Sequence, residues 1–363
     1  MIEVKDIKEV VPQTNLFSVL SNLGHEQVVF CQDKEAGLKA IIAIHNTTLG
    51  PALGGTRMWM YNNESDALND VLRLSRGMTY KASISGLNLG GGKAVIIGDS
   101  KKDKTDKLFQ RFGEFVNSLS GKYITAEDVG TSTNDMVNVS KSTKHVTGLP
   151  ENQGGGGDPS PVTAYGVFMG MKAAAKEMYG SDSLSGRKVS IQGCGHVGQN
   201  LVRLVTEDGG NVFVTDIHQE NLDKVKMYNP TIVDKDAVYD LDVDIYAPCA
   251  LGATLNSVNI AKLKCSIVAG AANNQLEDEV IHGQLLMQKG ILYAPDFLIN
   301  AGGLINVYSE IQGYNRDKAM QATQHIFNVT LDIFKNSKAN NIPTVDAAKH
   351  MAEKRISDAK ASR

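Results

Sequence analysis

The chain has 363 residues, of which 42% are hydrophobic and 21% are charged, a composition typical of globular domains. This length predicts two domains, each large enough to bury its own core. A net charge of −3 excludes a strongly basic surface, so we expect no nucleic-acid partner and no membrane partner.

Four cysteines bear on the cellular compartment. Cys31, Cys194, Cys249 and Cys265 are widely spaced and form no CxxC pair or metal-ligand pattern. The N-terminal residues show no basic segment followed by an apolar core, so no signal peptide is predicted. No apolar run reaches the roughly 20 residues that span a bilayer. We therefore expect reduced thiols, no bound metal and a cytoplasmic protein.

The first half of the chain mixes strand and helix patterns. In chain order these predict a β-hairpin over 28–44, a loop over 49–58, a helix from 66 that carries Lys81 near its end, a helix over 108–119 and a strand over 123–126. That last strand runs into Asp128. A carboxylate after a strand lies where active sites of α/β proteins form, although Asp also ends strands for simple turn reasons.

Two lysines stand out in this half. Lys81 and Lys93 are twelve positions apart, and Lys93 directly follows three glycines at 90–92. Three consecutive glycines let the backbone come close to a ligand and take positive φ values that other residues resist. A lysine fixed beside the apolar run 95–97 loses hydration, which favours its neutral amine and makes it a candidate base near pH 7. The alternative is a flexible turn with a solvated lysine.

The second half alternates strands and helices. A break in composition over 154–161, with four consecutive glycines, predicts a hinge loop. A helix follows over 163–178, then strands over 188–192, 211–215, 243–247, 266–269 and 290–293, and helices from 318 to the end, interrupted over 340–343. This alternation favours a parallel, doubly wound sheet.

A GxGxxG motif lies between the predicted strand 188–192 and a helix. The candidate dinucleotide-binding residues are Gly193, Cys194, Gly195, His196, Val197, Gly198 and Gln199. The three glycines allow a tight turn, approach to the pyrophosphate and close packing of helix on strand. Asp216 ends the next strand, where an acid binds the ribose hydroxyls and repels a 2′-phosphate, so NAD is favoured over NADP. A glycine-rich structural turn is the alternative.

A set of ordered motifs covers nearly the whole chain. They are GGTRM at 54–58, MTYK at 78–81, LNLGGGK at 87–93, TAEDVG at 125–130, GDPSPVTAYG at 157–166, AGAANNQ at 269–275 and NAGGLINV at 300–307. With these motifs the chain resembles the Glu/Leu/Phe/Val amino-acid dehydrogenases, and most closely the members that act on leucine.

The resemblance implies a two-domain α/β fold with an active-site cleft between the domains. Residues 1–147 would form a substrate-binding and oligomerisation domain, and residues 148–325 a Rossmann-type NAD-binding domain. The C-terminal helices, 326–363, would pack back on the first domain. The family forms homo-oligomers, often octamers, through the first domain.

The resemblance also implies residue roles. Lys93 would be the catalytic base, Lys81 would hold the substrate α-carboxylate, and Asp128 would exchange protons with the amino group. Thr163 and Asn274 would lie near the nicotinamide. Leu53, Gly54, Ala126, Leu304 and Val307 would surround the substrate, although ordinary core packing also explains the apolar residues. Glutamate-specific relatives carry a lysine at the position of Leu53 and a serine at that of Val307.

The expected function follows from these roles. Burying a glutamate side-chain carboxylate against Leu53 and Val307 would cost more than the roughly 2–7 kcal/mol of an unpaired neutral polar group. We therefore expect reversible NAD-dependent oxidation of L-leucine and other branched-chain amino acids to 2-oxo acids, ammonia and NADH. Valine or phenylalanine as the main substrate is an alternative, as is a non-catalytic NAD-binding regulatory protein, which retention of Lys93 and Asp128 disfavours.

Overall fold

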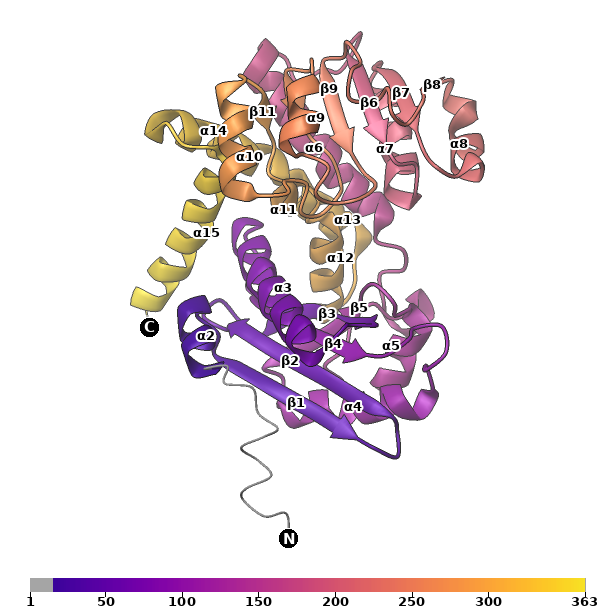
Figure 1. The fold of residues 1–363 in the computed structure, drawn as a ribbon, viewed down its shortest axis with the longest axis vertical. Helices are drawn as coiled ribbons and strands as arrows, with labels where there is room; N and C mark the ends of the chain where they lie inside the picture. Colours follow the sequence, from indigo (N-terminus) through magenta and orange to yellow (C-terminus); the bar gives the residue numbers. More distant parts are fainter. Residues whose placement is uncertain (1–15, 363) are drawn as a thin grey trace.

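The computed structural model describes residues 16–362, which fold into two α/β halves with one sheet each (Figure 1). The N-terminal segment in which no signal peptide is predicted lies outside these residues. Within 16–362, no helix combines the length and apolarity needed to cross a membrane. The four cysteines all lie in this part of the chain and are free thiols.

The first half contains a five-stranded mixed sheet in the order β1-β2-β4-β3-β5. Its elements are β1 (Gln27–Asp33), β2 (Leu38–Asn46), β3 (Ala52–Trp59), β4 (Gly90–Ile97), β5 (Tyr123–Glu127), α2 (Leu16–Leu23), α3 (Glu64–Ile84), α4 (Asp106–Ser118) and α5 (Thr133–Ser140). β1 and β2 form the predicted antiparallel hairpin. Side chains alternate between faces of β2, so Ile42 shares an apolar cluster with Phe109 of α4, and Ile41 shares another with Val71 of α3.

The prediction of a loop over 49–58 is wrong, because most of this segment is strand β3. β3 pairs in parallel with β4 on one side and with β5 on the other. Its two glycines fit a crowded central position rather than a turn. A Cβ on Gly54 would lie 1.7 Å from the carbonyl oxygen of Gly92, and one on Gly55 would lie 2.4 Å from that of Glu127.

The three glycines before Lys93 are also strand residues, so neither the positive φ expected for them nor the alternative of a flexible turn is observed. They begin β4, and none of them has a positive φ. A Cβ on Gly91 would lie 2.1 Å from the backbone nitrogen of Thr79, and one on Gly92 would lie 2.7 Å from the ring of Tyr123. The glycines therefore let α3 and the neighbouring strands approach β4 closely. As a result, Lys93 projects from a rigid strand rather than from a flexible turn.

The second half contains a six-stranded, all-parallel sheet in the order β11-β10-β9-β6-β7-β8. Its strands are β6 (Lys188–Gln192), β7 (Asn211–Thr215), β8 (Thr231–Ile232), β9 (Ile245–Pro248), β10 (Ile267–Val268) and β11 (Leu292–Tyr293). Its longer helices are α6 (Ser160–Tyr179), α7 (His196–Glu207), α8 (Gln219–Val225), α9 (Ser257–Lys262) and α10 (Glu279–Gln288). This is the strand order of dinucleotide-binding folds, and the predicted doubly wound sheet is confirmed. The short edge strand β8 was not predicted.

The last helices connect the two halves. They are α11 (Asp296–Ile299), α12 (Gly302–Ile311), α13 (Arg316–Gln324), α14 (Ile326–Asn340) and α15 (Thr344–Ala361). α14 packs on α6, whereas α15 packs on α3 of the first half (Figure 1). Arg355 of α15 donates hydrogen bonds to the carbonyl oxygens of Ser83 and Leu87 at the end of α3. The domain limits at 147 and 325 remain predictions.

Candidate active site

Lys93 and Asp128 form an ion pair where β4 and the end of β5 lie in one sheet. The Nζ of Lys93 lies 2.9 Å from Oδ2 of Asp128, although the residues are 35 positions apart in the sequence. The Lys93 side chain is 6% exposed and that of Asp128 is 25% exposed. The candidate base and the candidate proton-exchanging acid therefore lie in direct contact, and the Asp128 side chain retains access to solvent.

Lys81 reaches across the gap between the two halves. Its Nζ donates a hydrogen bond of 2.6 Å to Oδ1 of Asn300, the residue that follows α11. Asn300 is held in turn by hydrogen bonds to the backbone carbonyl of Ala271 and to the side chain of Asn273. The candidate carboxylate-binding lysine of the first half thus touches the second half directly.

Burial and neighbouring charges set the protonation of this group. Burial lowers the pKa of Lys81 to about 8, with Asp296 opposing the shift. Burial also lowers the pKa of Lys93, and the negative charge of Asp128 opposes this shift only in part. Burial alone would raise the pKa of Asp128, but Lys93 and Arg57 more than offset it and hold that pKa below its usual value. The arrangement therefore favours an ionised carboxylate beside lysines that lose protons more readily than free lysine.

The candidate substrate-contacting residues come from both halves. Leu53 on β3 and Leu304 on α12 are buried, and together with the partly buried Val307 they belong to one apolar cluster. Ala126 on β5 is buried beside Gly55 of β3. Gly54 follows Leu53 in the strand and is packed against β4. Leu53 pairs with Gly91 of β4, two residues before Lys93, and an apolar neighbour of this kind suits an amino acid with an apolar side chain.

The glycine loop after β6 has the geometry of a phosphate-binding turn. Gly193 has φ of 102°, which favours glycine, and a Cβ on Gly198 would lie 2.0 Å from the carbonyl oxygen of Gly193. A Cβ on Gly195, by contrast, would meet nothing within 4 Å, so the backbone there is open to a ligand. Gly195 caps the N-terminus of α7, whose first backbone N–H groups can receive phosphate oxygens. These features fit a dinucleotide.

The other candidate cofactor residues lie in or after this turn, or in α6 and the segment that follows β10. Asp216 accepts a 2.6 Å hydrogen bond from the backbone N–H of Cys194 and another from that of His218. His196 is exposed, with Nδ1 3.7 Å from a carboxylate oxygen of Asp158. Val197 and Gln199 lie in the first turn of α7, and Gln199 donates to the carbonyl of Cys194.

Thr163, a candidate residue near the nicotinamide, lies in the first turn of α6, and a Cβ on Gly303 would lie 3.0 Å from its hydroxyl. Asn274 has φ of 52°, which is rare outside glycine.

Three polar residues with prominent contacts were not singled out from the sequence. Arg57 bridges Asp128 and Asp70, and Glu310 accepts hydrogen bonds from the backbone of Gly148 and Gly156. Arg57 lies inside the GGTRM motif, so a signal existed for it. Asp70 and Glu310 lie in predicted or observed helices outside any motif, and only their contacts in the folded protein identify them as structurally important.

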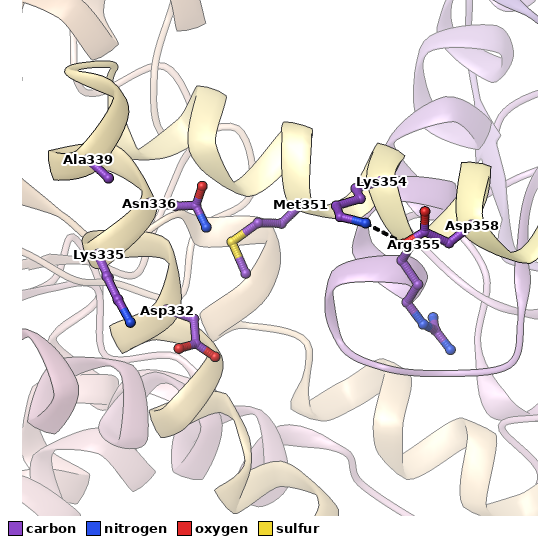
Figure 2. Close-up of a pocket in the computed structure, with 8 residues that line it drawn as sticks. All are labelled: Asp332, Lys335, Asn336, Ala339, Met351, Lys354, Arg355 and Asp358. Atoms are coloured by element: carbon purple, nitrogen blue, oxygen red, sulfur yellow. Dashed lines mark hydrogen bonds and ion pairs between the residues drawn. The ribbon is translucent and has the colours of Figure 1, made fainter.

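A groove of about 550 Å³ lies between α14 and α15, away from these residues (Figure 2). Its lining carries both signs of charge, including the ion pair of Lys354 and Asp358 at 2.6 Å. Lys354 and Asp358 pair with each other and Arg355 is bound to backbone carbonyl oxygens, so three of the charged lining side chains are already engaged within the protein. We do not assign the groove to the reaction.

Comparison with known families agrees with this geometry over most of the chain. Residues 25–145 match the family described as Glu/Leu/Phe/Val dehydrogenase, dimerisation domain. Residues 154–218 and 213–363 match the family described as Glutamate/Leucine/Phenylalanine/Valine dehydrogenase.

Individual relatives are similar over nearly their full length. The chain is 54% identical to the leucine dehydrogenase of Thermoactinomyces intermedius over 342 residues, which cover 94% of this chain and 93% of the relative. It is 48% identical to the phenylalanine dehydrogenase of Lysinibacillus sphaericus, with coverage of 94% and 91%. The crystal structure of L-tryptophan dehydrogenase from Nostoc punctiforme matches with a TM-score of 0.86 and 48% identity, covering 95% of this chain and 99% of that one.

The fold and the lysine–aspartate site thus define a two-domain oxidoreductase that acts on the CH–NH₂ group with NAD(P) as coenzyme. The chain belongs to the Glu/Leu/Phe/Val dehydrogenase family. Within that family it falls in the branch that contains the leucine, phenylalanine and tryptophan enzymes.

Proposed function

We propose that this enzyme oxidises L-leucine and other branched-chain L-amino acids with NAD. The reaction consumes the amino acid, NAD and water, and releases the 2-oxo acid, ammonium, NADH and a proton. The observation that carries the proposal is the Lys93–Asp128 ion pair, with Lys81 close enough to interact electrostatically with Lys93 and with the apolar Leu53 on the neighbouring strand. The sequence motifs and the leucine dehydrogenase relatives support it.

In this proposal the two lysines have different tasks. Lys81, with a pKa of about 8, carries a positive charge at neutral pH and binds the substrate α-carboxylate. Lys93, whose pKa burial lowers, takes a proton from the water that attacks the oxidised substrate carbon. Asp128 accepts a proton from the substrate amine and returns it to the departing ammonia.

The coenzyme is proposed to be NAD, held by the loop from Gly193 to Gln199. Bound NAD would supply the hydride acceptor of the reaction. The Asp216 carboxylate is kept ionised, since the N–H groups of Cys194 and His218 and the amide of Asn221 outweigh the effect of burial on its pKa. An ionised carboxylate there repels the 2′-phosphate of NADP.

The substrate preference rests on charge. Leu53 and Val307 offer no partner for a side-chain carboxylate, so glutamate is disfavoured by more than the roughly 2–7 kcal/mol that burial of an unpaired neutral polar group costs. Aromatic amino acids are the second candidate, because phenylalanine and tryptophan dehydrogenases are nearly as similar as the leucine enzymes. One methylene changes specificity by only about 1–3 kcal/mol, so the apolar lining separates these substrates weakly.

The test is NADH formation with L-leucine, L-valine, L-phenylalanine, L-tryptophan and L-glutamate. The highest kcat/KM on leucine would support the proposal, and a higher value on either aromatic substrate would replace it with the second candidate. Oxidation of glutamate would refute the charge argument. Lys93→Ala should abolish turnover, whereas Lys122→Ala, an exposed lysine of the same half, should not.

The assembly is proposed to be an octamer. The match of the first half to a dimerisation domain supports a homo-oligomer, and the octamer follows the family pattern. Light scattering coupled to gel filtration gives the subunit number directly. A dimer or hexamer would contradict the octamer without affecting the proposed reaction.

A further inference from the structure

Arg57 makes two ion pairs from its position on β3. Its Nε lies 3.1 Å from Oδ2 of Asp128, and its Nη1 lies 2.9 Å from Oδ2 of Asp70 on α3. Lys93 approaches the same oxygen of Asp128 at 2.9 Å. Because both cations contact Oδ2, the second carboxylate oxygen, Oδ1, remains to accept a proton from a substrate amine.

Asp70 holds Arg57 in a fixed orientation. Its Oδ2 also accepts a 2.8 Å hydrogen bond from the hydroxyl of Tyr61, and its Oδ1 accepts one of 3.0 Å from Arg73. The side chains of Arg57 and Asp70 are 23% and 17% exposed. The chain of contacts from Tyr61 to Asp128 therefore links β3, α3 and the loop after β5 through groups largely shielded from water.

We propose that Arg57 is a positioning residue for amino-acid oxidation: it fixes the orientation of the Asp128 carboxylate beside Lys93 and adds a permanent positive charge to the pair. This inference rests on the roles proposed for Lys93 and Asp128. The guanidinium is suited to the task because it is planar and permanently charged, and can bind two carboxylates at once in a set geometry. A lysine in its place would keep the charge but not the bridge.

The electrostatic part follows from the groups around the pair. The charged or titratable groups that face Lys93 and Asp128 are Arg57 from β3, Tyr61 from the segment after β3, Asp70 and Lys81 from α3, and Tyr123 from β5. Arg57 lowers the pKa of Lys93 and also that of Asp128. Loss of its charge therefore raises both pKa values, and both changes disfavour the reactive protonation state at neutral pH.

The experiment compares Arg57→Gln, Arg57→Lys and the matched control Arg73→Gln. Arg73 binds the other oxygen of Asp70 and its side chain is 57% exposed. The readout is kcat/KM against pH, with whichever amino acid the wild-type enzyme oxidises. Arg57→Gln should move the acidic limb upward by about one pH unit. Arg57→Lys should keep the limb in place but lower kcat by about tenfold or more, because orientation is lost. Arg73→Gln should match the wild type.

A second readout needs no turnover. Competitive acetylation of Lys93 with acetic anhydride over a pH series, followed by mass spectrometry of the peptide, reports the pKa of its amine. Arg57→Gln should raise the pKa of Lys93. This readout does not depend on turnover, so it tests the role of Arg57 even if the wild type oxidises none of the amino acids. Absence of oxidation would refute the proposed function but not the inference about Arg57. A pH-independent loss of rate with an unchanged Lys93 pKa would mean that Arg57 is only a structural ion pair, and would overturn the inference. If Arg57→Gln does not fold, Arg57→Lys tests the inference alone. A wild-type kcat in Arg57→Lys would show that the simultaneous contacts of Arg57 with Asp128 and Asp70 are not needed, and would overturn the inference.

Discussion

Asp128→Asn separates the two tasks of the candidate carboxylate, namely its charge and its ability to exchange protons. Asparagine keeps the shape of the side chain but removes the anion that lies 2.9 Å from Lys93, whose side chain is 6% exposed. Since burial lowers the pKa of Lys93 and Asp128 opposes that shift, the substitution should lower the pKa further. An opposite charge at this range is worth about 1–3 pH units.

Two changes should follow in the kinetics. The acidic limb of kcat/KM, which reports Lys93 losing its proton, should move to lower pH by about 1–3 units. At the same time kcat should fall by about 10²- to 10⁴-fold, because an amide cannot exchange protons with the substrate amine. The direction of the pH shift is opposite to that expected for Arg57→Gln, so the two variants check each other.

The assay is NADH formation over a pH series for the wild type, Asp128→Asn and Asp33→Asn. Asp33 is a matched control, because it lies on β1 of the same sheet and its carboxylate pairs with Arg111 of α4 at 2.8 Å. NADH affinity, measured by fluorescence titration, should be equal in all three proteins. An acidic limb that stays in place or moves upward in Asp128→Asn would refute the electrostatic reasoning, and a rate close to wild type would refute the proton-exchange role.

Three other substitutions test separate parts of the molecule. Asp216→Ser should lower the preference for NAD over NADP by about tenfold or more in kcat/KM, since a like-charge contact costs several kcal/mol; an unchanged ratio would show that Asp216 does not face the ribose. Gly92→Ala should lower the free energy of unfolding by about 1–3 kcal/mol in urea titration, because its Cβ would lie 2.7 Å from the Tyr123 ring. Gly77→Ala, with nothing within 4 Å of its Cβ, should not destabilise. Glu310→Gln should lower the free energy of unfolding by about 1–3 kcal/mol in the same titration, because the backbone N–H of Gly148 or Gly156 would then face an amide donor. Equal stability would mean that the segment between the two halves does not depend on this carboxylate.

The second half of the fold was largely predictable from the sequence, whereas part of the first half was not. Apolar strands such as 188–192 alternate with amphipathic helices, and this local pattern is sufficient to predict a parallel sheet. β3 and the start of β4 were missed because glycine is normally a sign of a turn. In β4 glycine is instead required because Asn46, Thr79 and Tyr123 leave no room for a Cβ, and these residues come close only after the chain has folded.

The candidate site was likewise predictable from the sequence only in part. Lys93 and Asp128 could be selected from the sequence, because each stands beside a probable strand within a motif. Their 2.9 Å contact could not be derived, since it depends on β3 lying between β4 and β5 and bringing distant segments together. Asp70 carries no local signal at all, because its importance depends on which face of α3 meets Arg57.

Helix α12 carries residues of two kinds. Leu304 and Val307 belong to the proposed substrate pocket, and Glu310, three positions after Val307, holds the backbone of Gly148 and Gly156 at 2.8 and 2.9 Å. Those two glycines belong to the segment that crosses from one half of the molecule to the other. A shift of the whole α12 helix that made room for a bulkier amino acid would therefore also move Glu310, which anchors the crossing segment. A redesign of the proposed pocket on α12 should therefore keep the contacts of Glu310 with the crossing segment.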